Sequence, residues 1–228
     1  MLIMPVSALV KTDVPFVTSL GVGAHLQAWG VPAERIFELD WWQTWRFPTG
    51  QLEITAAPSQ HFSGGGLKDG STTLWSSLVI RTPGHSVFFS GDIGLTPEYA
   101  AIRAAFRPFD LVMLEVEALN PSWGHIHLRP ANALQALDLL DGGAFLPVHW
   151  CTFSLSTHAW DEPAATLFEL APAHSGQLNM ARLGEAVEPA HAECVTPWWR
   201  AVDAVAVKAP AAEPVAETLP TSVPWPLD

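Results

Sequence analysis

The chain has 228 residues, 49% of them apolar, which suffices for the buried core of one large domain or two small ones. Its 23 acidic against 11 basic residues give a formal net charge of -12, and no Lys/Arg cluster occurs, which argues against nucleic acid as a partner. The two cysteines, Cys151 and Cys194, are too few for a disulfide framework, and we expect free thiols in a reducing, cytoplasmic compartment.

The chain opens on an apolar run at residues 1–10. This run has neither the positively charged start nor the cleavage site of a signal peptide, and Lys11 ends it well short of a membrane span. No stretch of roughly 18 uninterrupted apolar residues follows, so we expect no transmembrane segment.

Hydrophobic spacing then predicts strands and helices that alternate along the chain. In chain order these are a strand at 15–18, a helix at 20–30, strands at 51–57, 73–82 and 86–90, a helix at 97–106, a strand at 109–116, a helix at 130–140 and a strand at 144–148. The turn at 82–85 predicts a hairpin between the two strands beside it. The alternation in the later half indicates an α/β fold.

Regular patterning fades beyond Glu185. Residues 201–228 are rich in Ala, Pro and Val without a consistent period. We therefore predict one domain over residues 1–200 and an extended, poorly ordered tail over 201–228.

Three predicted strands run into a residue that can bind a metal ion. These residues are His61, Asp92 and His149. In layered α/β folds the C-terminal strand ends and the loops after them form the site. Imidazole nitrogen and carboxylate oxygen are both good zinc ligands, and a carboxylate has two oxygens with which to bridge two ions. Because single histidines near strand ends are usually surface or core residues, the order of these three alone leaves a chance arrangement open.

Six short segments add a more specific signal. They lie at residues 16–23 (FVTSLGVG), 38–42 (ELDWW), 58–61 (PSQH), 88–92 (FFSGD), 108–111 (PFDL) and 148–150 (VHW). In order and spacing they resemble the metallo-β-lactamase superfamily, in particular the branch of N-acylphosphatidylethanolamine-hydrolysing phospholipase D and its bacterial relatives. The resemblance covers roughly residues 4–186 and implies an αββα sandwich with a two-zinc site between the sheets.

The resemblance also assigns roles to residues. It implies that His61 binds one zinc ion, His149 binds the other, and Asp92 bridges both. A hydroxide between the ions would then attack a phosphodiester or related ester bond in a small-molecule or lipid-like substrate. His127 matches a further family histidine beside the site, which implies a substrate or proton-transfer role. The alternative for His127 is a residue at a helix start with no chemical role.

Cys151 stands where the family usually has glycine. A thiolate there can in principle bind zinc, but we interpret Cys151 as a small buried side chain.

The sequence departs from the family at its beginning. Members carry an H-x-H-x-D-H motif after an early strand, and the 228 residues contain none. Residues 2–5 align just after the place where that motif ends, so we expect only the C-terminal part of the sandwich, with its first sheet incomplete. Because catalytic zinc usually has three protein ligands, weak or partial zinc binding is expected. Two hypotheses remain, a metal-dependent hydrolase and a non-catalytic remnant or binding module, and no oligomeric state is indicated.

Overall fold

The computed structural model describes residues 3–64, 70–116, 126–152, 158–188 and 195–202. The chain divides into two compact units, Met1–Pro197 and Trp198–Asp228. The described part of the second unit holds the short helix η5 (Trp198–Ala201). The tail predicted at 201–228 lies almost entirely outside the described residues, so the tail and the domain boundary stay predictions.

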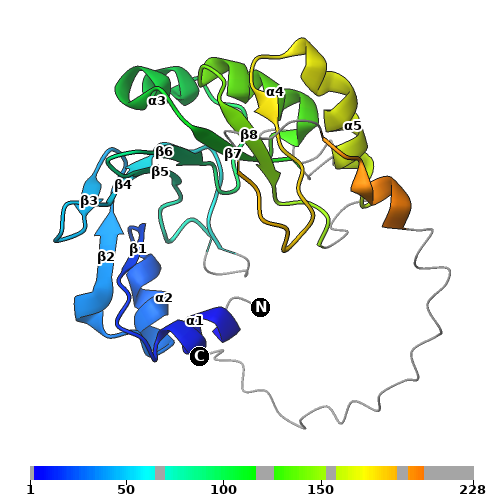
Figure 1. Cartoon of the computed structure of the whole chain (residues 1–228). Helices are drawn as coiled ribbons and strands as arrows, with labels where there is room; N and C mark the ends of the chain where they lie inside the picture. The colour runs from blue at the N-terminus through cyan, green and yellow to red at the C-terminus, as the bar shows by residue number, and fades with distance from the viewer. Residues whose placement is uncertain (1–2, 65–69, 117–125, 153–157, 189–194, 203–228) are drawn as a thin grey trace, which may run out of the picture. The chain divides into compact units, whose positions relative to one another are not determined.

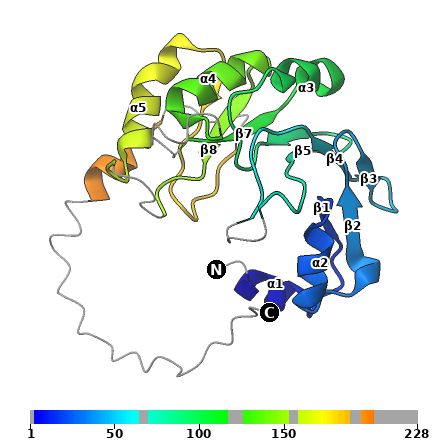
Figure 2. The same cartoon turned by 180° about the vertical axis from the view of Figure 1, so that it is seen from behind.

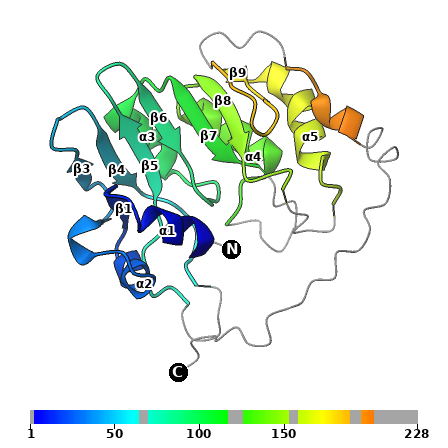
Figure 3. The same cartoon turned by 60° about the horizontal axis from the view of Figure 1, so that its bottom comes forward.

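A mixed sheet of seven strands forms the centre of the first unit (Figures 1 and 3). Its strands, in the order in which they pair, are β3 (Thr44–Arg46), β4 (Glu53–Ala57), β5 (Ser77–Arg81), β6 (Ser86–Phe89), β7 (Leu111–Glu115), β8 (Ala144–Val148) and β9 (Gln177–Leu178). The pairs from β3 to β6 are antiparallel, and the pairs from β6 to β9 are parallel. One half of the sheet is therefore a meander and the other half an α/β arrangement.

A smaller sheet holds the beginning of the chain. β1 (Phe16–Ser19) and β2 (Ile36–Leu39) pair in parallel, and α2 (Val22–Ala28) and η1 (Ala33–Arg35) connect them, after α1 (Ile3–Leu9). The Glu38 carboxylate accepts the Gly23 N–H at 2.8 Å, which caps the first turn of α2. The segment just before β5 contacts this part of the chain, through the Ser19–Ser76 hydroxyl pair at 3.0 Å and the Trp41 indole N–H, which donates to the Trp75 carbonyl at 2.8 Å.

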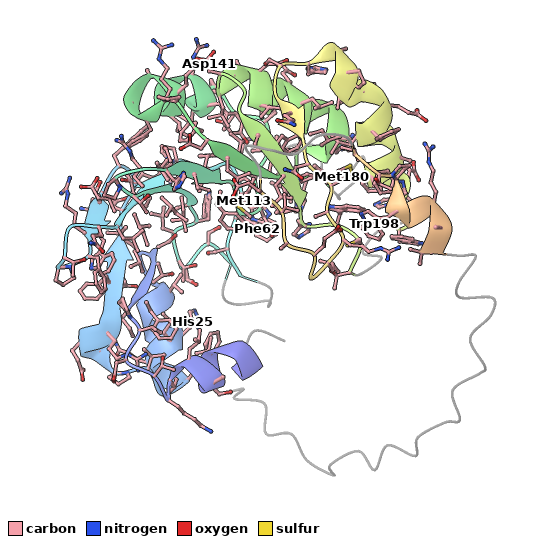
Figure 4. The ribbon with its side chains drawn as sticks, in the orientation of Figure 1. His25, Phe62, Met113, Asp141, Met180 and Trp198 are labelled. Carbon is pink, nitrogen blue, oxygen red and sulfur yellow. The ribbon has the colours of Figure 1, made fainter. Side chains whose placement is uncertain are left out.

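Three helices cover one face of the large sheet, as Figures 1 and 2 show from opposite sides. They are α3 (Glu98–Phe106), α4 (Arg129–Leu139) and α5 (Glu162–Leu170), the last followed by η3 (Ala171–Ala173). The core under them is built from side chains at most 1% exposed, among them Ile102, Val112, Leu114, Leu134, Leu137 and Leu167. Since strand side chains alternate between faces, Met113 points to the opposite side of β7, as its position in Figure 4 shows. None of the helices in the described ranges combines the length and apolarity needed to cross a membrane.

The predicted α/β fold class is confirmed, and the strand predicted at 144–148 matches β8 at both ends. The predicted hairpin is also present, but its first strand starts at Ser77 and not at residue 73. The backbone of residues 73 and 74 is instead hydrogen-bonded to groups outside the large sheet. Thr73 exchanges hydrogen bonds with the Ser63 hydroxyl, and the Leu74 N–H donates to the Leu20 carbonyl at 2.8 Å.

Asp138 on α4 ties this helix to the segment that leads into β9. Its carboxylate lies 2.7 Å from His174 Nδ1 and accepts bonds from the hydroxyl and the N–H of Ser175 at 2.6 and 3.1 Å. Partial burial acts to raise the pKa of Asp138, but the bonds from Ser175 and His174 and the charge of His174 outweigh it. The pKa of Asp138 therefore lies below its ordinary value.

Asp138→Asn is expected to lower the free energy of unfolding by about 0.5–1 kcal/mol near neutral pH, a value discounted for the 41% exposure of the side chain. Because the folded pKa is depressed, the stabilisation exists above the unfolded pKa and disappears as the pH falls through the folded one. Urea unfolding at several pH values measures this difference, with Asp13→Asn as the exposed control. A difference that persists at the lowest pH would contradict the assignment.

Gly143, between α4 and β8, has a backbone that only glycine adopts without strain. Its φ is +106°, and a Cβ atom there would lie 2.7 Å from the Phe109 carbonyl oxygen. Gly143→Ala is expected to cost about 1–3 kcal/mol of unfolding free energy. Gly50→Ala is the control, because Gly50 also has a positive φ of +70° but no atom within 4 Å of its Cβ position. Equal losses in urea unfolding would show that the Phe109 contact does not matter.

Candidate functional site

Four strands of the large sheet end at the same edge. β6, β7 and β8 are parallel neighbours, and β4 has the direction of β6 because two antiparallel pairings separate them. The residues at or just after these strand ends are His61, Asp92, Glu115 and His149. The sheet therefore collects three of the predicted site residues and one further carboxylate at one edge.

The predicted site residues lie close together in space. His149 Nε2 lies 3.5 Å from Asp92 Oδ1. The ring of His127, two residues before α4, has its centroid 5.2 Å from that of His61 and 5.7 Å from that of His149. All four side chains named from the sequence thus meet at one place, while their roles stay predictions.

His61 is held by its own neighbour in the chain. Its Nδ1 lies 2.7 Å from the Phe62 carbonyl oxygen, and the two rings stack at 4.9 Å with an interplanar angle of 6°. Its Nε2 is buried and has no hydrogen-bond partner among the described residues. Phe62 itself is 46% exposed and, in Figure 4, lies on the side of the sheet opposite to α3 and α4. Nδ1–H donation to the carbonyl leaves the lone pair on Nε2, facing the site.

Two further contacts connect the loop of His61 with the loop of Asp92. The Gly94 N–H donates to the Gln60 carbonyl at 2.8 Å, and the Ser59 hydroxyl lies 3.5 Å from the Asp92 carbonyl oxygen. The loops after β4 and β6 are thus joined by one backbone hydrogen bond and one side-chain contact, although β5 lies between the two strands.

The turn after β8 has an unusual backbone. His149 has φ +60° and Cys151 has φ +63°, in the left-handed region that is costly for residues other than glycine. Between them the buried Trp150 donates its indole N–H to the Pro147 carbonyl at 3.1 Å, which holds the turn closed. Cys151 is partly exposed, so the prediction of a buried side chain at this position is wrong. Its positive φ matches a position where glycine is favoured.

Glu115 was not predicted from the sequence as a site residue. Its side chain is fully buried, and its Oε1 lies 3.3 Å from His127 Nδ1 and accepts the Leu128 N–H. Burial and, to a lesser extent, the negative charge of Glu115 raise the pKa of Tyr99 far above its ordinary value, so this phenol stays protonated. The available signal was the carboxylate itself, because a buried parallel strand rarely carries a charge.

The site residues form a partial fit to a metal ion. Within the parts of the chain that the structure describes, no group of three or more His, Cys, Asp or Glu side chains is close enough to hold one. The donor chemistry nevertheless suits a metal. A histidine that donates Nδ1–H to a carbonyl and keeps a buried Nε2 lone pair has the usual arrangement of a metal ligand, and His61 shows it. With the neighbouring Asp92 and His149, it forms a partial donor set.

An apolar pocket of about 530 Å³ is also present in the first unit. It is lined by residues from β1, α2, β3 and β4 and the segments beside them, none of them titratable. It contains none of the site residues, so we assign it no part in the chemistry.

Comparisons with known proteins identify the family to which this chain is similar. Residues 3–150 match the sequence profile of the β-lactamase superfamily domain. An uncharacterized protein of Mycobacterium tuberculosis is 41% identical over 189 residues, which cover 82% of this chain and 50% of that protein. The mitochondrial N-acyl-phosphatidylethanolamine-hydrolyzing phospholipase D of Saccharomyces cerevisiae is 30% identical over 145 residues, or 60% of this chain and 31% of the enzyme.

The solved structure of Igni18, a metallo hydrolase from the archaeon Ignicoccus hospitalis, has the same fold. Its TM-score is 0.60 at 20% identity, with 80% of this chain and 72% of that chain covered. The chain spans about half the length of its mycobacterial relative. The profile match covers more than half of the chain, and the fold agrees with it, which confirms the predicted resemblance. The chain therefore belongs to the β-lactamase superfamily and has its metallo-hydrolase fold.

Proposed function

We propose that this chain forms part of a metal-dependent hydrolase in which zinc is held by His61, Asp92 and His149. The observation that carries the proposal is the convergence of these side chains and His127, from well-separated chain segments, on one edge of the sheet. Side chains at strand ends are positioned by hydrogen-bonded backbone, as a catalytic centre requires. The similarity to metallo-hydrolases supports the same class of chemistry.

Each residue has a role that follows from its position. Zinc, when bound, supplies activated water and polarises the bond that is broken. His61 offers its buried Nε2, and Asp92 and His149, 3.5 Å apart, offer a carboxylate and an imidazole. Because a carboxylate has two oxygens, Asp92 is the residue suited to bridge if two ions bind. His127, whose ring lies next to those of His61 and His149, is the candidate to move a proton to or from the substrate.

The proposed substrate is a phosphodiester or related ester, small or lipid-like. The yeast relative is named for the hydrolysis of N-acyl-phosphatidylethanolamine, which points to this bond type. Phe62 supports an apolar group on the substrate, because it is 46% exposed and stacks on His61.

One observation favours a second candidate, a non-catalytic binding module. No group of three or more metal-binding side chains is assembled in the described ranges, whereas catalytic zinc usually has three protein ligands. Metal binding and hydrolysis therefore have to be measured separately.

Zinc binding tests the proposed ligands. In calorimetric titrations of the purified chain, His61→Ala, Asp92→Ala and His149→Ala are each expected to weaken zinc binding at least about tenfold, because each removes a donor. His25→Ala is the matched control, since His25 lies exposed on α2 and its loss should leave the titration unchanged. If all three site variants bind zinc as the wild type does, the ligand assignment is wrong.

Hydrolysis tests the role of His127. With saturating zinc and bis(p-nitrophenyl) phosphate or p-nitrophenyl acetate as substrate, His127→Ala is expected to lower kcat about 10²–10⁴-fold, the usual effect of losing a proton-transfer residue. Its zinc affinity should stay within about twofold of the wild type, because His127 is not a proposed ligand. Zinc binding without hydrolysis of either substrate would favour the binding module.

A further inference from the structure

Burial of the Glu115 carboxylate costs free energy, and none of the roles proposed above involves this residue. Its side chain has 0% exposure at the end of the central strand β7, where Glu115 pairs with Val148, the residue before His149. Burying a carboxylate costs several kcal/mol unless it is paired and hydrogen-bonded. The polar groups around it therefore have to compensate for this cost.

The strand directs this carboxylate toward the site. Val112 and Leu114 face the helices and are fully buried. Side chains on a strand alternate, so Glu115 shares the face of Met113, which in Figure 4 is the side opposite to α3 and α4. The Glu115 N–H is bonded to the Ser90 hydroxyl at 3.2 Å, which fixes the end of the strand.

The two oxygens of Glu115 have different surroundings. Oε1 accepts the Leu128 N–H and lies 3.3 Å from His127 Nδ1. Oε2 is buried without a hydrogen-bond partner among the described residues. The negative charge therefore faces His127 and the first turn of α4.

A carboxylate next to one nitrogen of a histidine decides which nitrogen carries the proton. It favours N–H on the side that faces it and leaves the other nitrogen with its lone pair. For His127 the nitrogen near Glu115 is Nδ1, 3.3 Å from Oε1 in a charge contact that does not have the geometry of a hydrogen bond, so the carboxylate acts on the ring through its negative charge. The ring of His127 lies beside those of His61 and His149, at the proposed site.

We propose that Glu115 is a positioning residue whose buried carboxylate keeps the proton of His127 on Nδ1, so that Nε2 is the nitrogen that accepts or donates the catalytic proton. The role rests on the proposed function of His127. Nothing requires Glu115 to touch the substrate or the metal, and it acts through the imidazole.

A purely structural role makes a different prediction. If Glu115 served only to cap the Leu128 N–H, any neutral acceptor in its place would suffice, and His127 would keep its own tautomer preference. Glu115→Gln separates the two roles, because its side-chain oxygen can still accept from Leu128 while the charge is lost. Glu115→Met removes both functions.

Nitrogen NMR of labelled histidine measures directly which ring nitrogen of His127 carries the proton. We expect the ¹⁵N spectrum of the wild-type chain with labelled histidine, at about pH 8.5 and so above the ordinary histidine pKa of about 6.5, to show His127 protonated on Nδ1. The His127→Gln spectrum assigns the signal by its absence. Nδ1 protonation should decrease in Glu115→Gln and decrease further in Glu115→Met, whereas Asp110→Asn should not change it. Asp110 is the matched control because it also accepts a backbone N–H, from Ser86, but at the other end of β7.

Kinetics give a second readout. Glu115→Gln is expected to lower kcat about 10–100-fold, with KM and zinc affinity within about twofold of the wild type. In a His127→Ala background the same change should have less than about a twofold effect, because the two residues act as one unit.

The outcomes separate this proposal from the function on which it rests. An unprotonated Nδ1 in the wild-type spectrum overturns the role of Glu115, even if hydrolysis is found and even if the Glu115 variants do not fold. A protonated Nδ1 that responds to Glu115→Gln supports it in a chain that hydrolyses neither substrate, and in that case only the proposed function fails.

Discussion

Hydrogen bonding between the parallel strands β6, β7 and β8 is the constraint on which the site depends. Their registers pair Phe89 with Met113 and Glu115 with Val148, so the strand ends are aligned to within a few residues. Side chains at or just beyond these ends can meet only because the registers hold. β4 joins the same edge through two antiparallel pairings and brings His61 with it. Any change that shifts one register therefore moves a site residue.

The packing of the helices secures these registers from the other face. Val112, Leu114 and Phe145 are fully buried, and moving them by one residue would turn them toward the site. The hydrophobic face and the polar site are thus opposite sides of the same strands. On the polar side the buried Glu115 carboxylate accepts the Leu128 N–H, and the Ser90 hydroxyl accepts the backbone N–H of the same residue.

Much of the fold was predictable from hydrophobic spacing. The strand at 144–148 was found at both ends because its apolar run stops at a glycine pair on one side and a histidine on the other. The start of β5 was misplaced because residues 73 and 74 bond to distant loop partners that no local pattern reveals. α1, β2, β3, α5 and β9 were not predicted; β3 and β9 have only three and two residues, too few to show a period. The site was predictable only in part, because strand ends and family motifs pointed to the histidines and Asp92, whereas Glu115 lies inside an apolar run.

The turn after β8 carries backbone strain at a residue of the proposed site. His149 and Cys151 both have left-handed backbones, and glycine at either position would relax a strain of about 1–2 kcal/mol. Glycine at 149 would, however, remove the imidazole that lies 3.5 Å from Asp92. Selection for thermal stability alone would therefore favour the loss of this histidine, and under the proposed role of His149 the position is one where stability and activity compete. Position 151 holds none of the proposed site residues, so glycine there would relieve the same kind of backbone strain without changing them.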